Sequence, residues 1–394
     1  MPRGRSPAWR SATLTGFLAV LGSLSPACAS DSPPSPPRSS VGEAPTAANP
    51  SLVTYPGTEW RRADPREAGF DPAKLDKIAA EAQKNGSNCL VVIRHGKLVA
   101  DWYWNGTSVT TSQEVFSATK SYSSTLIGIA QAADELDVDD KVSKYVSSWA
   151  GTPSENVRIK NILSNDSGRH WDPTTDYRDL LRAADRTRFA VELDQDAAPG
   201  RTWVYNNAAI QTLDAVLKKA TGKNPADYAK ERLLGPIGMS HSQMTRDSAG
   251  NTNMFFGFHS TCEDMARFGY LFLRGGAWTD TQIVPARWVK EATGRPSQTL
   301  NAAYGYLWWL NNRGPVVANP LQASSRQQSA KAPRRRLVEG APKEMYWALG
   351  LGGQIIQIDP GSDTVVVRLG RGDARSKYGP AHTAKLVTQA LVKP

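Results

Sequence analysis

Cysteine and histidine are scarce in this chain, with three and five of them among 394 residues. The histidines show no metal-binding spacing: they are His95, His170, His241, His259 and His382. The sequence also lacks a His-Glu-x-x-His zinc motif, a Gly-x-Ser-x-Gly nucleophile elbow and a phosphate-binding glycine loop. These absences argue against zinc-protease, α/β-hydrolase and nucleotide-binding chemistry. We therefore expect neither a metal nor a cofactor.

Long apolar runs are lacking as well, and the stretch Ala12–Leu24 is too short to span a bilayer comfortably. Arginines precede it and Ala27-Cys28-Ala29 follows it, so residues 1–29 have the layout of an export signal. Cleavage after Ala29 would release a soluble protein. Cleavage before Cys28, in a sequence that resembles a lipoprotein box, would leave a lipid anchor on that cysteine. We expect a bacterial protein outside the cytoplasm, secreted or held in the cell envelope, and slightly favour the soluble form.

Two cysteines remain after such cleavage, Cys89 and Cys262. An oxidising compartment permits a disulfide between them. Two buried thiols are an equally simple explanation, and we favour the thiols.

Charge is strongly of one sign, with a formal net charge of +10. The basic residues are mostly dispersed, and the one dense cluster is Lys331, Arg334, Arg335 and Arg336 in a polar stretch. A solvated loop explains such a cluster as well as a nucleic-acid site does, so we expect no nucleic-acid partner. The segment 30–57 is rich in proline and serine and is predicted to be a linker ahead of one domain, 58–394.

The pattern of apolar residues predicts an α+β fold with strands near both ends and helices between them. Alternating or β-branched segments predict two hairpins, 89–94 with 97–104 and 354–359 with 364–369. Apolar spacing predicts helices over 120–136, 207–220, 225–234 and 381–392. The helical part should cover roughly 117–235 and the sheet part 58–116 with 236–394. The polar, basic segment 311–345 is predicted to be a long loop, part of it without fixed structure.

Ser117-Ala118-Thr119-Lys120 is the first set of residues that carries chemistry. A serine hydroxyl needs a base to become a nucleophile, and residues three apart share one face of a helix. A lysine with a lowered pKa could be that base. This is the only Ser-x-x-Lys in the chain, and an apolar helix follows it directly. A serine helix cap beside a solvated lysine would produce the same four letters.

Tyr205-Asn206-Asn207 is the second set. The Tyr205 hydroxyl could shuttle protons to a leaving group, and the Asn207 amide could orient a substrate. Tyr103-Trp104-Asn105 has the same pattern, but it ends the first hairpin and is interpreted as structural. A buried structural tyrosine is the alternative for Tyr205 as well.

A glycine-rich segment, Gly350-Leu351-Gly352-Gly353-Gln354, leads into the second hairpin. Its glycines would let the backbone approach a ligand closely, and the N–H groups near Gly350 and Leu351 could bind an oxyanion. An ordinary strand bend would also use such glycines. His170 and Trp171 follow Ser167-Gly168 in a loop where Trp171 could contact a substrate or be a surface aromatic.

Taken in order, Ser117 with Lys120, Tyr205 with Asn207, and the glycine-rich strand resemble the serine β-lactamase and penicillin-binding-protein superfamily. The resemblance covers most of 60–390, and its Tyr-x-Asn form points to the class C-like branch. That branch holds class C β-lactamases, D-amino-peptide hydrolases, family VIII carboxylesterases and 6-aminohexanoate-dimer hydrolases. The resemblance implies an antiparallel sheet flanked by helices, a helical subdomain, and an acyl-enzyme on Ser117.

The third motif departs from the family, because no Lys-Thr-Gly or His-x-Gly occurs and Ala348-Leu349-Gly350 occupies its place. The family's cation at that position helps to bind the carboxylate of β-lactams. Its absence favours a secreted esterase or amidase, acting on a small ester, amide or peptide, over a β-lactamase or a carboxypeptidase for D-amino peptides. A non-catalytic module that kept the fold is the alternative from another class, and it leaves Ser117, Lys120 and Tyr205 unexplained together.

Overall fold

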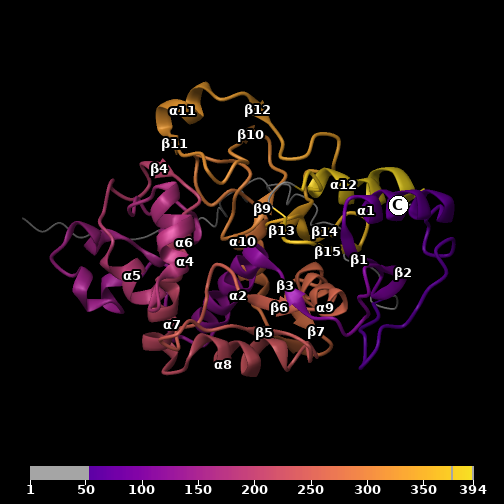
Figure 1. The fold of residues 1–394 in the computed structure, drawn as a ribbon, viewed down its shortest axis with the longest axis horizontal. Helices are drawn as coiled ribbons and strands as arrows, with labels where there is room; N and C mark the ends of the chain where they lie inside the picture. Colours follow the sequence, from indigo (N-terminus) through magenta and orange to yellow (C-terminus); the bar gives the residue numbers. More distant parts are fainter. Residues whose placement is uncertain (1–52, 374–375, 393–394) are drawn as a thin grey trace, which may run out of the picture. The chain divides into compact units, whose positions relative to one another are not determined.

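An antiparallel sheet of six strands, built from both ends of the chain, organises the computed structural model, which describes residues 53–373 and 376–392 (Figure 1). The strand order is β2-β1-β15-β14-β13-β9. The bounds are β1 Ser87–Arg94, β2 Lys97–Tyr103, β9 Trp309–Leu310, β13 Tyr346–Gly350, β14 Gln354–Asp359 and β15 Thr364–Gly370. The predicted α+β class and both predicted hairpins are confirmed.

Tight turns with positive backbone φ close both hairpins. His95 and Gly96, with φ of 52° and 73°, join β1 to β2, and Asp363, with φ of 55°, lies in the turn between β14 and β15. Pairing of β1 with β15, for example Val91 with Val367, then joins the two hairpins into one sheet. The residues of β1 and β15 are buried and many are β-branched, which explains why these two strands lie inside the sheet rather than at its edges.

Helices cover both faces of the sheet. On α9, Cys262–Leu273, Gly269 lies so close to Val365 and Ile356 that a Cβ there would be 2.6 and 2.9 Å from their methyl carbons. The other face carries α12, whose Thr383 hydroxyl donates to Gln357, the neighbour of Ile356 on β14. Successive side chains of a strand point to opposite faces, so the two helices lie on opposite sides. The covering elements include α1 Pro72–Lys84, α12 Pro380–Lys385 and the π-helical turn η8 Leu386–Ala390.

The helix α2, Thr119–Ala132, lies at the centre of the helical part and is buried on all sides over its first twelve residues. Carbonyl oxygens accept from two of its buried hydroxyls: Ser121 donates to Leu307 O and Ser123 to Met254 O. The other helical elements are η2 Phe116–Ala118, η3 Val142–Lys144, η4 Ser147–Trp149, η5 Pro153–Asn156, α3 Ile159–Leu163, η6 Thr175–Asp179, α4 Leu180–Arg182, α5 Arg186–Glu192, α6 Asn207–Gln211, α7 Leu213–Thr221, α8 Pro225–Ala229, η7 Lys230–Leu234 and α10 Ala286–Thr293.

Each predicted helix exists, but its bounds differ. The helix predicted to reach residue 136 ends at Ala132, because Asp134 adopts a left-handed φ of 57° and Leu136 is buried from the following turn instead. The one predicted over 207–220 divides at Thr212. The second half of 225–234, like the end of the chain from Leu386, forms π-type turns. Apolar spacing cannot distinguish these interruptions from a continuous helix.

The segment 311–345 is largely a loop, as predicted, but it also includes short regular elements. It contains β10 Gly314–Pro315, β11 Ser324–Ser325, α11 Arg326–Lys331 and β12 Arg334–Arg335. Val317 and Val338 are buried although Leu321 is exposed, and the Asn311 side chain donates to the carbonyls of Val338, Ala341 and Pro342. Pairing of β11 with β4, Thr202–Trp203, connects this segment to the helical part. The remaining short strands are β3 Gln113–Glu114, β5 Gln243–Met244, β6 Phe258–Ser260, β7 Ala277–Trp278 and β8 Thr281–Gln282.

Cys89 and Cys262 form a disulfide, so our preference for two buried thiols is wrong. The bond joins β1 to the first residue of α9, with the two Cα atoms 6.5 Å apart. The packed region also begins before residue 58, since Thr54 O accepts from the Tyr270 hydroxyl and Gly57 O from Arg267. The predicted export signal, Cys28 and most of the predicted linker lie outside the described residues. In the part of the chain that is described, no helix has the length and apolarity needed to cross a membrane.

Candidate active site

Ser117 lies in η2, the short turn that leads into α2. Phe116, directly before it, adopts a φ of 48°, a left-handed conformation that costs a bulky residue free energy. The Thr119 hydroxyl donates to Phe116 O at 2.6 Å and holds this turn in place. Ser117 is therefore presented half-buried on a strained turn at the start of a buried helix.

Lys120 reaches back along α2 to the serine. Its Nζ donates to Ser117 Oγ at 2.9 Å and to the backbone carbonyl of Phe255 at 2.9 Å. The side chain is 1% exposed, and burial lowers the pKa of Lys120 to about 7 against an opposing effect of Asp176. A lysine with this pKa is partly neutral near pH 7 and can accept the serine proton. The predicted pair is thus brought together, and the alternative of a solvated lysine is wrong.

The Tyr205 side chain also contacts the Ser117 side chain. Burial raises the pKa of Tyr205, while an interaction of its hydroxyl with Ser117 lowers it. Its ring lies 4.6 Å from Lys120 Nζ and stacks on Trp309, with ring centroids 5.8 Å apart. Trp309 belongs to the edge strand β9, so the sheet fixes the position of a tyrosine from the helical part. Tyr205 therefore lies beside both Ser117 and Lys120.

Asn207 begins α6 two residues later and is buried, and its side-chain Oδ1 has no hydrogen-bond partner. Its backbone N–H donates to Asp176 at 3.1 Å, and that of Ala208 at 2.9 Å. Asp176 is 1% exposed, and burial raises its carboxyl pKa to about 6 against these two N–H groups and Lys120. Asp176 was not predicted as a site residue, because an aspartate in a polar loop carries no signal of its own.

The closing strand β13 ends against the nucleophile turn. A Cβ on Gly350 would lie 2.1 Å from Val115 O, so only glycine fits where the two backbones meet. Leu351 follows at the surface, 46% exposed. Ala348, at the first position of the third motif, is fully buried and cannot reach a ligand. This approach explains the glycine at 350 and brings the backbone near Leu351 close to η2.

His170 and Trp171 border the Asp176 loop. Trp171 is half-buried, and the interaction of its side chain with Asp176 lowers the pKa of that carboxyl. Burial lowers the pKa of His170, but Asp196 and Asp172 on its two ring nitrogens outweigh that effect and raise it. A contact of Trp171 with a substrate stays a prediction, while His170 is engaged by carboxylates.

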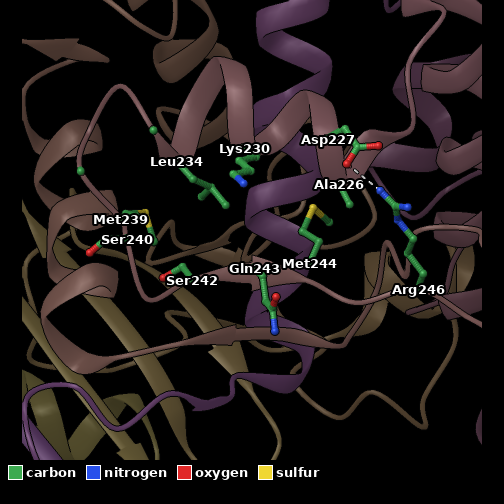
Figure 2. A pocket seen from close by; sticks show the side chains of 12 residues that line it. Ala226, Asp227, Lys230, Leu234, Met239, Ser240, Ser242, Gln243, Met244 and Arg246 are labelled. Carbon is green, nitrogen blue, oxygen red and sulfur yellow. Dashed lines mark hydrogen bonds and ion pairs between the residues drawn. The ribbon is translucent and has the colours of Figure 1, made fainter.

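Two other features lie apart from these residues. Tyr103 of the repeated Tyr-x-Asn pattern contacts Glu263, and Asn105 donates to Ser87 O, so this copy lies apart from Ser117 as expected. The cleft in Figure 2, about 530 Å³ between α8 and β5, includes none of the catalytic candidates. Its Arg246 and Asp227 neutralise one another. No group of described residues could hold a metal ion.

Comparisons with known proteins show the family and the fold of this chain. A family model described as "Beta-lactamase" matches residues 75–389. The 6-aminohexanoate-dimer hydrolase of Paenarthrobacter ureafaciens is 23% identical over 332 residues, 78% of this chain and 80% of that protein. A class C β-lactamase bound to cefoxitin superposes with a TM-score of 0.59 at 17% identity, over 80% of this chain and 96% of that one. The octameric penicillin-binding-protein homologue of Pyrococcus abyssi gives 0.60 at 18%, over 81% and 76%.

Proposed function

The chain belongs to the beta-lactamase family of serine hydrolases, and on that premise we propose that it cleaves an ester or an uncharged amide through an acyl-enzyme on Ser117. The observation that carries the proposal is the 2.9 Å contact between Ser117 Oγ and the buried Lys120 Nζ. Because burial lowers the pKa of Lys120 to about 7, part of this lysine is a neutral amine at physiological pH and can act as the base.

Acylation begins when neutral Lys120 takes the proton of Ser117 and the Oγ attacks the substrate carbonyl carbon. The oxyanion that forms is held by the backbone N–H groups of Ser117 and Leu351. Tyr205 passes a proton to the leaving alcohol or amine and recovers one from Lys120. The buried Asn207 Oδ1, which has no protein partner, accepts an N–H of an amide substrate. The carbonyl–leaving-group bond breaks, and the acyl group stays on Ser117.

Deacylation repeats the same steps with water. The Lys120–Tyr205 pair takes a proton from the water, the resulting hydroxide attacks the acyl carbonyl, and Ser117 leaves as the alkoxide and is reprotonated. Asp176 does not touch the reacting atoms, but it contributes to both acylation and deacylation. Its carboxylate holds the start of α6, where Asn207 lies, and raises the pKa of Lys120 against the effect of burial.

The closing strand favours a substrate without a carboxylate next to the reacting bond. Of the three positions of the third motif, Ala348 is buried, while Leu349 and Gly350 offer neither charge nor a side-chain hydrogen bond. Losing one charge-assisted hydrogen bond costs about 1.5–3 kcal/mol, roughly ten- to a hundredfold in rate. The exposed Arg334 and Arg335 lie on the ribbon of β10 and β12, and ordering them over the site would cost side-chain entropy.

A comparison of kcat/KM on p-nitrophenyl butyrate and nitrocefin tests the substrate class. We expect p-nitrophenyl butyrate to be hydrolysed more efficiently than nitrocefin. Ser117→Ala should lose both activities. The matched control changes Arg334 and Arg335 to alanine. Efficient nitrocefin hydrolysis that survives this change contradicts the proposed substrate preference.

We also propose that the chain acts outside the cytoplasm. The Cys89–Cys262 disulfide supports this proposal, because such bonds persist in oxidising compartments. Intact-mass analysis of protein from the native host distinguishes the outcomes: a chain beginning at Ser30 supports the soluble form, a lipid on Cys28 supports the anchored form, and an uncleaved Met1 terminus contradicts export.

A further inference from the structure

We propose that Arg368 and Gln354 are positioning residues that lock the turn Gly350–Gly353 so that the Leu351 N–H faces Ser117. This inference rests on the proposed function, in which that N–H binds the oxyanion. It adds two side chains, from β15 and β14, that do not touch the substrate and act through the backbone of the turn.

Arg368 is fully buried, yet its hydrogen bonds go to neutral oxygens. Its Nη1 donates to Gly352 O at 2.5 Å and to Gly353 O at 2.9 Å. Its Nε donates to the Ser87 hydroxyl at 2.8 Å, and its Nη2 to Asn85 O at 3.2 Å. A single rigid guanidinium therefore joins the turn to the start of β1.

The surroundings of Arg368 are shaped for a guanidinium. A Cβ on Gly370 would lie 2.2–2.4 Å from Cζ, Nη1 and Nη2 of Arg368, and one on Gly353 would lie 3.0 Å from Nη1. The Tyr378 ring covers the group, with its centroid 4.7 Å from Cζ. Burial lowers the pKa of Arg368 only to about 10, so the group stays charged at neutral pH. No carboxylate hydrogen-bonds to it among the described residues, so its bonds to neutral oxygens alone must offset the cost of removing the charge from water.

Gln354 engages the same turn from the neighbouring strand. Its Nε2 donates to Leu351 O at 2.9 Å and to Gly370 O at 3.0 Å, while its Oε1 accepts from Gly370 N at 2.8 Å. The amide is fully buried, so water does not compete for these bonds. Gln354 thus fixes the one carbonyl of the turn that Arg368 and the backbone leave free.

All four carbonyls of the turn are therefore occupied. Gly350 O accepts from Gly353 N at 3.1 Å, Leu351 O from Gln354, and the last two from Arg368. The bond on Gly350 O orients the peptide whose N–H belongs to Leu351. Among the described residues, no hydrogen bond of the turn uses this N–H. A donor held in advance stabilises a developing oxyanion without reorganising during the reaction.

The test measures kcat, KM and the affinity of a boronic acid, whose tetrahedral adduct on the serine mimics the transition state. Wild type is compared with Arg368→Met, Arg368→Lys and Gln354→Glu, using p-nitrophenyl butyrate. We expect Arg368→Met to lower kcat at least about tenfold with KM within about threefold. Boronate affinity should fall in parallel with kcat/KM. Arg368→Lys should recover part of the loss, because an ammonium can still donate to the carbonyls.

Arg94→Met is the matched control. Arg94 is a buried arginine whose guanidinium also donates to carbonyls, Ala68 O and Ser362 O, at the other end of β1. This variant should melt at a lower temperature with kcat near wild type. If Arg368→Met does not fold, Gln354→Glu decides, since it is isosteric and cannot donate to Leu351 O.

Two results overturn the inference: folded Arg368 and Gln354 variants that keep wild-type kcat and boronate affinity, or an equal loss of kcat in Arg94→Met. Failure of the proposed function looks different, because turnover would then persist in Ser117→Ala.

Discussion

The pH dependence of turnover reports directly on Lys120. Only the neutral amine can take the Ser117 proton, and burial lowers the pKa of this lysine to about 7. The rate on an ester should therefore rise with pH through an inflection near 7. An exposed lysine would place that inflection near about 10.4.

The expected change is large enough to measure. With a pKa of about 7, roughly a tenth of the enzyme holds a neutral Lys120 at about pH 6 and nine tenths at about pH 8, so kcat/KM should rise about tenfold between them. The assay follows p-nitrophenyl butyrate at the isosbestic wavelength of p-nitrophenol, with the rate of Ser117→Ala subtracted at each pH.

Asp176→Asn tests the electrostatic origin of this inflection. The Asp176 carboxylate raises the pKa of Lys120, so removing its charge should move the inflection to lower pH. Asp214→Asn is the matched control, because Asp214 is also fully buried but pairs with Lys218 on α7. A flat profile in wild type, or an inflection that both variants move equally, refutes this reasoning.

Three further changes probe the surroundings of the site. Cys89→Ser should lower the free energy of unfolding by about 2–5 kcal/mol in urea titrations, because the bond closes a loop between residues 173 apart, and an unchanged midpoint would speak against the disulfide. Gly350→Ala should lower kcat by about tenfold or more, since its Cβ would meet Val115 O; wild-type kcat in a folded variant would show that this approach is not needed. Lys120→Met should raise the free energy of unfolding by about 1 kcal/mol more at about pH 6 than at about pH 8. Because the pKa of Lys120 is lower in the folded than in the unfolded state, the unfolded state binds more protons between these two pKa values, and the stability of wild type rises with pH there. An equal stability gain of Lys120→Met at both pH values would contradict this reasoning.

Local patterns predicted the features that depend on short stretches of chain. Ser117 and Lys120 are three residues apart on one helix, so their contact follows from helix geometry. Both hairpins follow from alternation and turn residues. The motif of Tyr205 was recognised because it follows a turn and opens a helix. Gly350 was singled out because glycines let a backbone approach another group closely.

Features set by distant contacts could not be predicted in this way. Asp176 lies in a polar loop, and its role depends on α6 folding against it. Arg368 looks like a surface cation in a strand, although its charge is buried behind the turn that follows β13. The Cys89–Cys262 pairing depends on how α9 lies across the sheet, and two cysteines in a sequence contain no record of that.

The most direct test of the central claim is the site of covalent modification. A fluorophosphonate reacts with an activated serine and reports neither substrate preference nor binding alone. We predict one adduct per chain, located on Ser117 by peptide mass spectrometry, absent in Ser117→Ala and much slower to form in Lys120→Met. An adduct on another residue, or equally fast labelling of Lys120→Met, would contradict the account.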